Sequence, residues 1–177
     1  VFTGTSLACS LTMGSATAFA ETDWYFGGNV GRASEEISID FLTGGNQFRE
    51  PIVTLLGVHS GFNYDFGPAF VGVEGDIAFP TNGNFSSVCR AGEFCSLEYK
   101  AHLRGRIGLD FDEIRLFAAG GLVFADFEVN PGFSDSGPRS TRSLNGTTIG
   151  GGIEYMPEDE NWSARIEVLY DRFDREV

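Results

Sequence analysis

The sequence contains little positive charge and no long apolar run. Lysine occurs once, at Lys100, and Lys plus Arg total 12 against 25 Asp plus Glu, so the formal net charge is −13. A nucleic-acid backbone is bound by a basic face, so we expect no nucleic acid as a partner. After residue 20, no stretch offers the roughly 18 consecutive apolar residues of a transmembrane helix. If the chain spans a membrane, it must do so with strands.

Cysteine is also scarce, with three residues in the chain. Cys89 and Cys95 lie close together in one polar segment, and we predict that they form a loop disulfide, with two free thiols as the alternative. Two thiols without an adjacent His do not complete a tetrahedral set, so we expect no metal site. The glycine-rich pieces do not open helices, so no phosphate-binding loop and no cofactor are expected.

The first 20 residues carry no charge and end in Ala18-Phe19-Ala20 before Glu21. A modestly apolar stretch that closes on an A-x-A pattern predicts a secretory signal peptide over residues 1–20, cleaved before Glu21. An apolar first strand or helix is the alternative. The basic region and the initiator Met of such a peptide are missing, so we expect the sequence to be incomplete at its start. Residues 21–177 are then predicted to form one domain.

Residues 99–111 alternate strictly. Tyr99, Leu103, Ile107 and other apolar residues occupy the odd positions, while the even positions are charged, polar or glycine. This period of two predicts a strand, and its length exceeds the usual 5–6 or so residues of soluble strands. A membrane-crossing strand needs about 9–11 residues. The pattern is typical of a barrel strand with one face toward lipid, although a half-buried strand of a soluble sandwich also alternates.

The same test predicts seven strands after residue 20: Asp23–Gly31, about Ile52–Phe66, Phe70–Phe79, Tyr99–Phe111, Ile114–Phe127, Thr147–Tyr155 and Trp162–Tyr170. Their connections alternate between long ones and tight ones, the tight ones being at Gly67-Pro68, at Asp112-Glu113 and over Pro157–Asn161. An up-and-down barrel in the outer membrane has this asymmetry, with short periplasmic turns and long external loops. We therefore predict an all-β, antiparallel transmembrane β-barrel in the bacterial outer membrane.

The non-lipid faces of these strands carry acids and bases that should point into the lumen. Unpaired charges in a narrow interior are costly, so we predict a structural network of ion pairs and hydrogen bonds. Its expected members are Glu74, Asp76, Lys100, His102, Arg104, Arg106, Glu154, Arg165 and Glu167, with Asp110 and Asp171 on the same faces. Inward glycines such as Gly57, Gly61, Gly72, Gly108 and Gly150 are expected to make room for the Arg and Lys side chains.

Several segments resemble the small outer-membrane β-barrel proteins of Gram-negative bacteria, the OmpA-like or Omp25/Omp31-type "porin family". The segments are Trp24-Tyr-Phe-Gly-Gly28, Phe70-Val-Gly-Val-Glu-Gly-Asp76, Arg104-Gly-Arg-Ile-Gly108, Ala119-Gly-Gly-Leu-Val123 and Ile149-Gly-Gly-Gly-Ile-Glu-Tyr155. The resemblance implies an eight-stranded barrel. Since seven strands leave unpaired edges that lipid cannot satisfy, we expect the eighth strand and the terminal aromatic residue to be missing at the C-terminus.

The resemblance further implies a role in envelope integrity or as a surface antigen or adhesin, with no enzymatic activity. A small-solute porin is the alternative, and a lipid-modifying enzyme or lipid binder is a lesser one. We predict no catalytic residue, because the neighbours His59 and Ser60 point to opposite faces of a strand. The expected partners are outer-membrane lipid and lipopolysaccharide, host or surface ligands at the external loops, and the barrel-assembly machinery during biogenesis.

Overall fold

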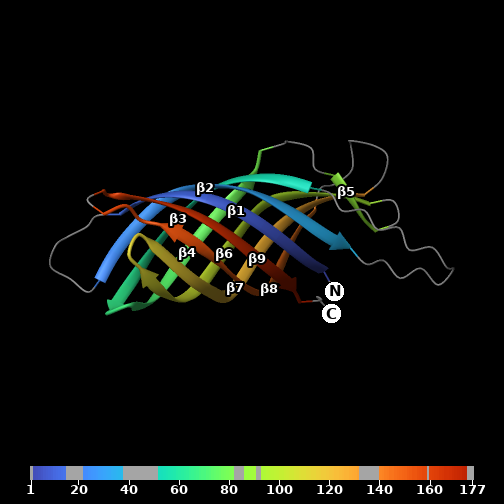
Figure 1. Cartoon of the computed structure of the whole chain (residues 1–177). Helices are drawn as coiled ribbons and strands as arrows, with labels where there is room; N and C mark the ends of the chain where they lie inside the picture. The colour runs from blue at the N-terminus through green and yellow to red at the C-terminus, as the bar shows by residue number, and fades with distance from the viewer. Residues whose placement is uncertain are drawn as a thin grey trace.

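The fold is a β-barrel, seen in a computed structural model that describes residues 2–14, 22–37, 52–81, 86–90, 93–131, 140–158 and 160–174 (Figure 1). Its strands are β1 (Phe2–Gly14), β2 (Thr22–Ile37), β3 (Ile52–Phe66), β4 (Ala69–Pro80), β5 (Ser86–Arg90), β6 (Glu93–Phe111), β7 (Ile114–Pro131), β8 (Ser140–Tyr155) and β9 (Trp162–Phe173). Among these described residues, no helix is long and apolar enough to cross a membrane.

The wall closes on itself. The strand order is β4-β3-β2-β1-β9-β8-β7-β6, and an antiparallel pairing of β4 with β6 joins the two ends of this order. The short β5 pairs only with the start of β6 and lies outside the ring. A closed ring gives every wall strand two hydrogen-bonded neighbours, which is the condition that lipid imposes on spanning strands. The predicted fold class, an antiparallel all-β barrel, is confirmed.

The wall contains eight strands, so the prediction of a missing C-terminal strand is wrong. The remaining position is filled by β1, which pairs with β2 from Phe2↔Ile37 onward and with β9 from Phe2↔Phe173 onward. This placement also differs from the predicted boundary at residue 20, because Phe2–Gly14 lie in the wall rather than in a separate leader. The assignment of residues 1–20 to a signal peptide stays a prediction.

The sequence of β1 fits a wall strand once it is read with a period of two. Leu7, Cys9 and Leu11 are exposed on the outer face, whereas Ser6 and Ser10 are buried inside. Because the inner positions carry small hydroxyl side chains instead of charged ones, the segment has no charge. An uncharged, modestly apolar segment is also the composition of a signal peptide. Both interpretations use the same residues, and only the pairing partners distinguish them.

The outer face of the barrel is a continuous apolar surface. The exposed large apolar side chains include Leu56 and Val58 of β3, Leu103 and Ile107 of β6, Leu116 and Leu122 of β7, and Ile166 and Val168 of β9. Aromatic residues flank this surface at the turn end, where the rings of Trp24 and Phe62 lie 5.0 Å apart and those of Tyr155 and Trp162 lie 6.2 Å apart. Such a surface is suited to a lipid bilayer with an interfacial aromatic girdle.

Short connections lie at the end of the barrel opposite β5 (Figure 1). Gly67 adopts φ = 76° between β3 and β4, and Asp112 adopts φ = 51° between β6 and β7. This left-handed conformation is open to glycine and tolerated by Asp, which permits two-residue turns. The longer connections at the other end lie largely outside the described residues, as do the side chains of Cys89 and Cys95, so the loop disulfide stays a prediction.

Inward-facing glycines leave space on the inner wall, but the side chains that occupy this space are not the expected Arg and Lys. A Cβ atom at Gly61 would meet the Tyr25 hydroxyl, and one at Gly72 would meet the Asn63 amide oxygen. At Gly108 it would come within 2.5 Å of the Phe70 ring and collide with the Leu116 carbonyl. These glycines therefore admit aromatic and amide side chains against the inner wall, while Arg and Lys reach past them to the centre.

We predict that Gly108→Ala destabilises the barrel by about 1–3 kcal/mol, because an added inward methyl group overpacks the wall. Gly105 on the same strand provides the matched control, since its Cβ would face outward and meet only the Gly120 carbonyl at 3.8 Å. Gly105→Ala should be neutral or stabilise the barrel by about 0.5 kcal/mol, the usual gain of Ala over Gly in a strand. Guanidinium unfolding in lipid vesicles measures both, and equal effects would contradict the inward packing.

The eight-stranded wall further predicts that the mature protein in outer membranes retains Phe2–Gly14. Intact mass and N-terminal sequencing of the protein extracted from membranes measure this directly. A mature chain that starts at Glu21 would instead establish the signal peptide. It would also require another strand to lie between β2 and β9.

Candidate functional site: the charged lumen

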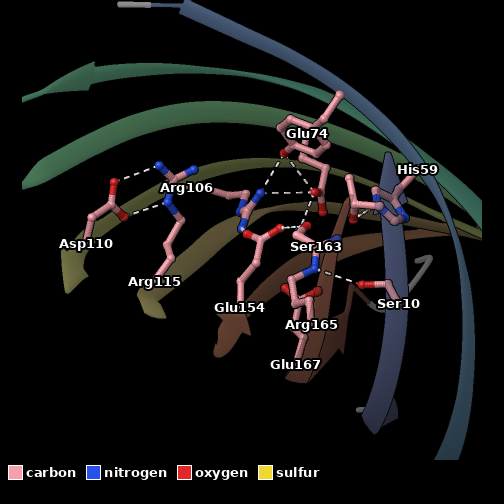
Figure 2. Close-up of polar contacts among 12 residues, drawn as sticks. Ser10, His59, Glu74, Arg106, Asp110, Arg115, Glu154, Ser163, Arg165 and Glu167 are labelled. Atoms are coloured by element: carbon pink, nitrogen blue, oxygen red, sulfur yellow. Dashed lines mark hydrogen bonds and ion pairs between the residues drawn. The ribbon is translucent and has the colours of Figure 1, made fainter. Parts of the chain in front are cut away.

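The nine residues predicted for the lumen network all point into the barrel from four strands. Glu74 and Asp76 come from β4, the four basic residues Lys100 to Arg106 from β6, Glu154 from β8, and Arg165 and Glu167 from β9. They lie at every second position because alternate strand residues share a face. The structure therefore brings side chains from opposite walls together on the barrel axis (Figure 2).

Glu74 is the centre of this lumen network. One of its oxygens lies 2.6 Å from Arg104 Nη2, and the other lies 2.7 Å from Arg165 Nη1 and 3.3 Å from Arg106 Nη1. The Tyr25 hydroxyl donates a hydrogen bond of 2.8 Å to the same carboxylate. Glu74 has 0% of its surface exposed, so these four donors replace all of its hydration.

Two of the three arginines around Glu74 reach further acids. Arg104 contacts Glu167 at 2.6 Å and Asp76 at 2.8 Å. Arg106 contacts Glu154 at 3.1 Å, and Ser163 donates a 2.6 Å hydrogen bond to that carboxylate. These two guanidinium groups thus bridge carboxylates of different strands, while Arg165 joins β9 to Glu74 of β4. The network therefore ties opposite walls of the barrel to one another.

A second cluster lies toward the loop end of the lumen. Lys100 Nζ lies 2.6 Å from Asp171, which is fully buried. His102 lies between two acids, with Nδ1 2.9 Å from Asp76 and Nε2 3.4 Å from Asp171. Asp76 also contacts Arg104, so this cluster is continuous with the one around Glu74.

The third cluster lies at the turn end and includes a residue that sequence reasoning missed. Arg115 of β7 contacts Asp110 at 2.6 Å and Asp65 at 2.9 Å, and its guanidinium lies 4.1 Å from the centre of the Phe70 ring. The signal was available, because Arg115 lies between Ile114 and Leu116, which are exposed on the outer face, and a period of two turns Arg115 inward. The apolar, glycine-rich remainder of β7 obscured it.

Tyr25 is another lumen residue that was missed. It lies between Trp24 and Phe26, two exposed aromatic residues that concealed its inward direction. Its ring is buried beside Arg106, whose guanidinium also lies 4.2 Å from the Phe117 ring centre. The rings of Tyr25 and Phe117 therefore act as cation–π partners of Arg106, in addition to its carboxylate partners.

β1 contributes hydroxyl groups and no charge to the lumen. Ser10 accepts a 3.0 Å hydrogen bond from Arg165 Nε, and Ser6 accepts one of 3.3 Å from Lys100. Thr12 Oγ1 lies 2.9 Å from His59 Nε2. These contacts were not predicted, because residues 1–20 were interpreted as a signal peptide.

Cavities remain in the described part of the barrel. One of about 210 Å³ lies at the turn end beside Tyr25 and Arg115, and one of about 40 Å³ lies beside Ser6, His102 and Arg165. Tyr25, Arg106 and Glu74 lie between them at the level of the central ion pairs. Among the described residues, no group of His, Cys, Asp and Glu is placed to hold a metal ion.

Comparison with known proteins gives one family match and one curated relative. The sequence matches the outer membrane protein beta-barrel domain over residues 6–175. A "22 kDa outer membrane protein" of Rhizobium leguminosarum bv. viciae is 27% identical over 113 residues, covering 64% of this chain and 49% of the relative. The chain therefore spans about half the length of the curated relative it matches.

Two solved structures are similar over 97% of each chain. One is Ail, the attachment invasion locus protein of Yersinia pestis, with 11% identity and a TM-score of 0.43. The other is Ail in complex with the heparin analogue sucrose octasulfate, with 13% identity and a TM-score of 0.43.

The geometry around Glu74 predicts that Glu74→Ala destabilises the barrel by about 3–5 kcal/mol, because arginines on three sides lose their shared partner. Guanidinium unfolding in vesicles and heat-modifiable gel mobility measure the change. Glu158→Ala, at an exposed turn position, is the control and should leave both unchanged. A Glu74→Ala effect as small as that of the control would show that the network is not needed for stability.

Proposed function

This chain belongs to the outer membrane protein beta-barrel domain family, and from that premise we propose that it is a non-enzymatic barrel that supports the bacterial envelope and acts at the cell surface. The localisation in the outer membrane and the resemblance noted in the sequence are confirmed by the family and by the curated relative. A small barrel with a buried charged network is what the structure displays. Its specific role is our inference.

The observation that carries the proposal is the filled lumen. Glu74, Arg106 and Arg165 meet on the axis, and every one of them is at most 3% exposed. An eight-stranded barrel is just wide enough for its own side chains, so ion pairs at this level occupy the cross-section. A protein whose interior is filled in this way acts through its rigidity and its outer surfaces rather than through transport.

The partners follow from the two surfaces that remain. The apolar outer face is suited to outer-membrane lipid and lipopolysaccharide. The long connections at the end opposite the tight turns would face outward and could contact host or surface ligands as an antigen or adhesin. Insertion of such a barrel also implies contact with the barrel-assembly machinery during biogenesis.

The small-solute porin is the second candidate. The cavities of about 210 and 40 Å³ lie at different levels of the lumen, and these two volumes favour some internal water. The ion pairs between them are short and almost fully buried, which opposes a continuous path. We therefore rank transport below the structural role.

A lipid-modifying enzyme is the least favoured candidate. His59 is 3% exposed and points into the barrel, whereas Ser60 points outward and donates a hydrogen bond of 3.0 Å to the Tyr25 carbonyl. A nucleophile and its base must lie within hydrogen-bonding reach of each other. Adjacent residues on opposite faces of β3 do not meet this condition.

Planar-bilayer recording tests the proposal. Purified full-length protein should insert without giving stable conductance, because the ion pairs of Glu74 with Arg104 and Arg165 close the lumen. A trimeric porin added to the same bilayer is the positive control. Stable single-channel steps from the wild-type barrel would contradict the structural role and establish the porin alternative.

A further inference from the structure

We propose that Arg32 and Arg172 form a binding site for the anionic headgroup of a lipopolysaccharide molecule, on the outer face of the barrel near its loop end. We call these two residues the arginine pair. The inference rests on the proposed function, which names lipopolysaccharide as a partner and places the long connections outside. It adds where on the wall the headgroup binds and which side chains recognise it.

The closed wall brings the arginine pair to one part of the surface, although the two residues lie far apart in the chain. Arg32 belongs to β2 and Arg172 to β9, and β1 lies between these strands. Arg32 is opposite Leu7 of β1, whereas Arg172 is opposite Thr3 of the same strand. With a rise of about 3.3 Å per residue and a strand spacing of about 4.8 Å, this register puts the two Cα atoms roughly 16 Å apart. Two long side chains can therefore contact one headgroup of disaccharide size.

The arginine pair lies at the loop-end border of the apolar outer face. On each strand, the outward face begins with a tryptophan at the turn end and continues with exposed apolar side chains up to the arginine: Trp24, Phe26 and Val30 on β2, and Trp162, Ile166, Val168 and Tyr170 on β9. From tryptophan to arginine, the strands cover roughly 26–33 Å at about 3.3 Å per residue. A tilt of about 40° reduces this to roughly 20–25 Å, close to the height of a lipid-facing band. The two guanidinium groups are therefore at the level of the outer headgroups.

The arginine pair has no acidic partner among the described residues. The four arginines of the lumen all form ion pairs. By contrast, Arg32 and Arg172 are exposed, and no described Asp or Glu forms an ion pair with either of them. Asp174 is exposed two positions after Arg172 and makes no ion pair with it. At the level of lipid headgroups, such bases attract the anionic groups of lipids.

Hydroxyl groups cover the wall between the two arginines. Thr5 of β1 is opposite Ser34 of β2 and Tyr170 of β9. Thr5 is exposed, and Tyr170 has 46% of its surface exposed, so both can hydrogen-bond a sugar or an anion. Leu7, on the apolar side of Thr5, is 53% exposed and can contact acyl chains. Along β1 the surface thus changes from apolar to hydroxyl-bearing with a guanidinium on each side, which is the order of groups along a glycolipid.

This arrangement favours a lipopolysaccharide headgroup over a phospholipid headgroup. A guanidinium group forms two parallel hydrogen bonds with a phosphate or carboxylate, so the arginine pair provides two separate anion sites. The lipid A disaccharide carries a phosphate at each end, whereas a glycerophospholipid carries one phosphodiester next to its acyl chains. Two separate anion sites therefore match the disaccharide.

Native mass spectrometry of the full chain, folded in a nonionic detergent, measures the dissociation constant of bound diphosphoryl lipid A. We expect one tightly bound molecule. Arg32→Gln and Arg172→Gln should each raise the dissociation constant at least about threefold, and the double variant at least about tenfold, because each change removes a guanidinium–anion contact. Arg142→Gln is the matched control, since it removes an exposed arginine of β8 at the same end, and it should leave the constant unchanged.

Two other lipids test the headgroup class. Monophosphoryl lipid A has the same sugars but lacks one phosphate, so the wild-type chain should bind it at least about threefold more weakly. This difference should shrink in each single variant, because one guanidinium has then lost its anion in either case. If the wild type binds monophosphoryl lipid A or phosphatidylglycerol as tightly as diphosphoryl lipid A, the two-anion headgroup site is wrong.

The outcomes separate this site from the proposed function. An unchanged dissociation constant in the double variant, with heat-modifiable mobility intact, would overturn the site and leave the structural role standing. An equal loss in Arg142→Gln would show general charge attraction and overturn the site in the same way. If the wild type binds no lipid A, both the site and lipopolysaccharide as a partner are wrong. Stable conductance of the wild type would overturn the structural role alone, because the arginine pair lies on the outer face.

Discussion

The lumen of this barrel is organised around one buried carboxylate that neutralises several guanidinium groups at once. Glu74 receives Arg104, Arg106 and Arg165 from two other strands. Arg104 and Arg106 continue to further acids, and Arg165 continues to the Ser10 hydroxyl. Removing one of these groups would leave a buried charge without a partner, which lowers the free energy of unfolding by roughly 3–5 kcal/mol. The stability contributions of these residues therefore depend on one another. The filled central level of the lumen is a consequence of this shared neutralisation.

Lipid imposes the complementary condition on the outside. The bilayer offers no hydrogen bonds, so all backbone groups must be paired within the wall and all ionic side chains must turn inward. The ring of eight strands meets the first requirement, and the strict alternation of β6 meets the second. Inward glycines such as Gly108 then keep the inner wall close to the rings of Phe70 and Phe117. The barrel is therefore apolar outside, ionic inside and densely packed between.

Sequence reasoning predicted the residues whose environment is set by their own strand. Lys100, His102, Arg104 and Arg106 were placed inside because a period of two leaves no other choice once the apolar face meets lipid. It assigned the segment Phe2–Gly14 to a signal peptide, whereas the structure places this segment in the wall, because an uncharged run with small residues satisfies both a leader and a wall strand. Tyr25 and Arg115 were missed for a related reason, since apolar neighbours on both sides concealed their inward direction.

The alternation of polar and apolar residues, together with the alternation of long and tight connections, was enough to predict the barrel class, the lipid-facing surface and nine members of the ionic network. These features follow from local patterns in the chain. The tertiary structure alone decided which strand closes the ring, which acid each arginine contacts and where the cavities of the lumen lie. These features arise from pairings between residues far apart in the chain, such as Ser10 with Arg165 and Asp65 with Arg115. Periodicity within a strand carries no information about strand order or register, because those are set by how the wall closes in space.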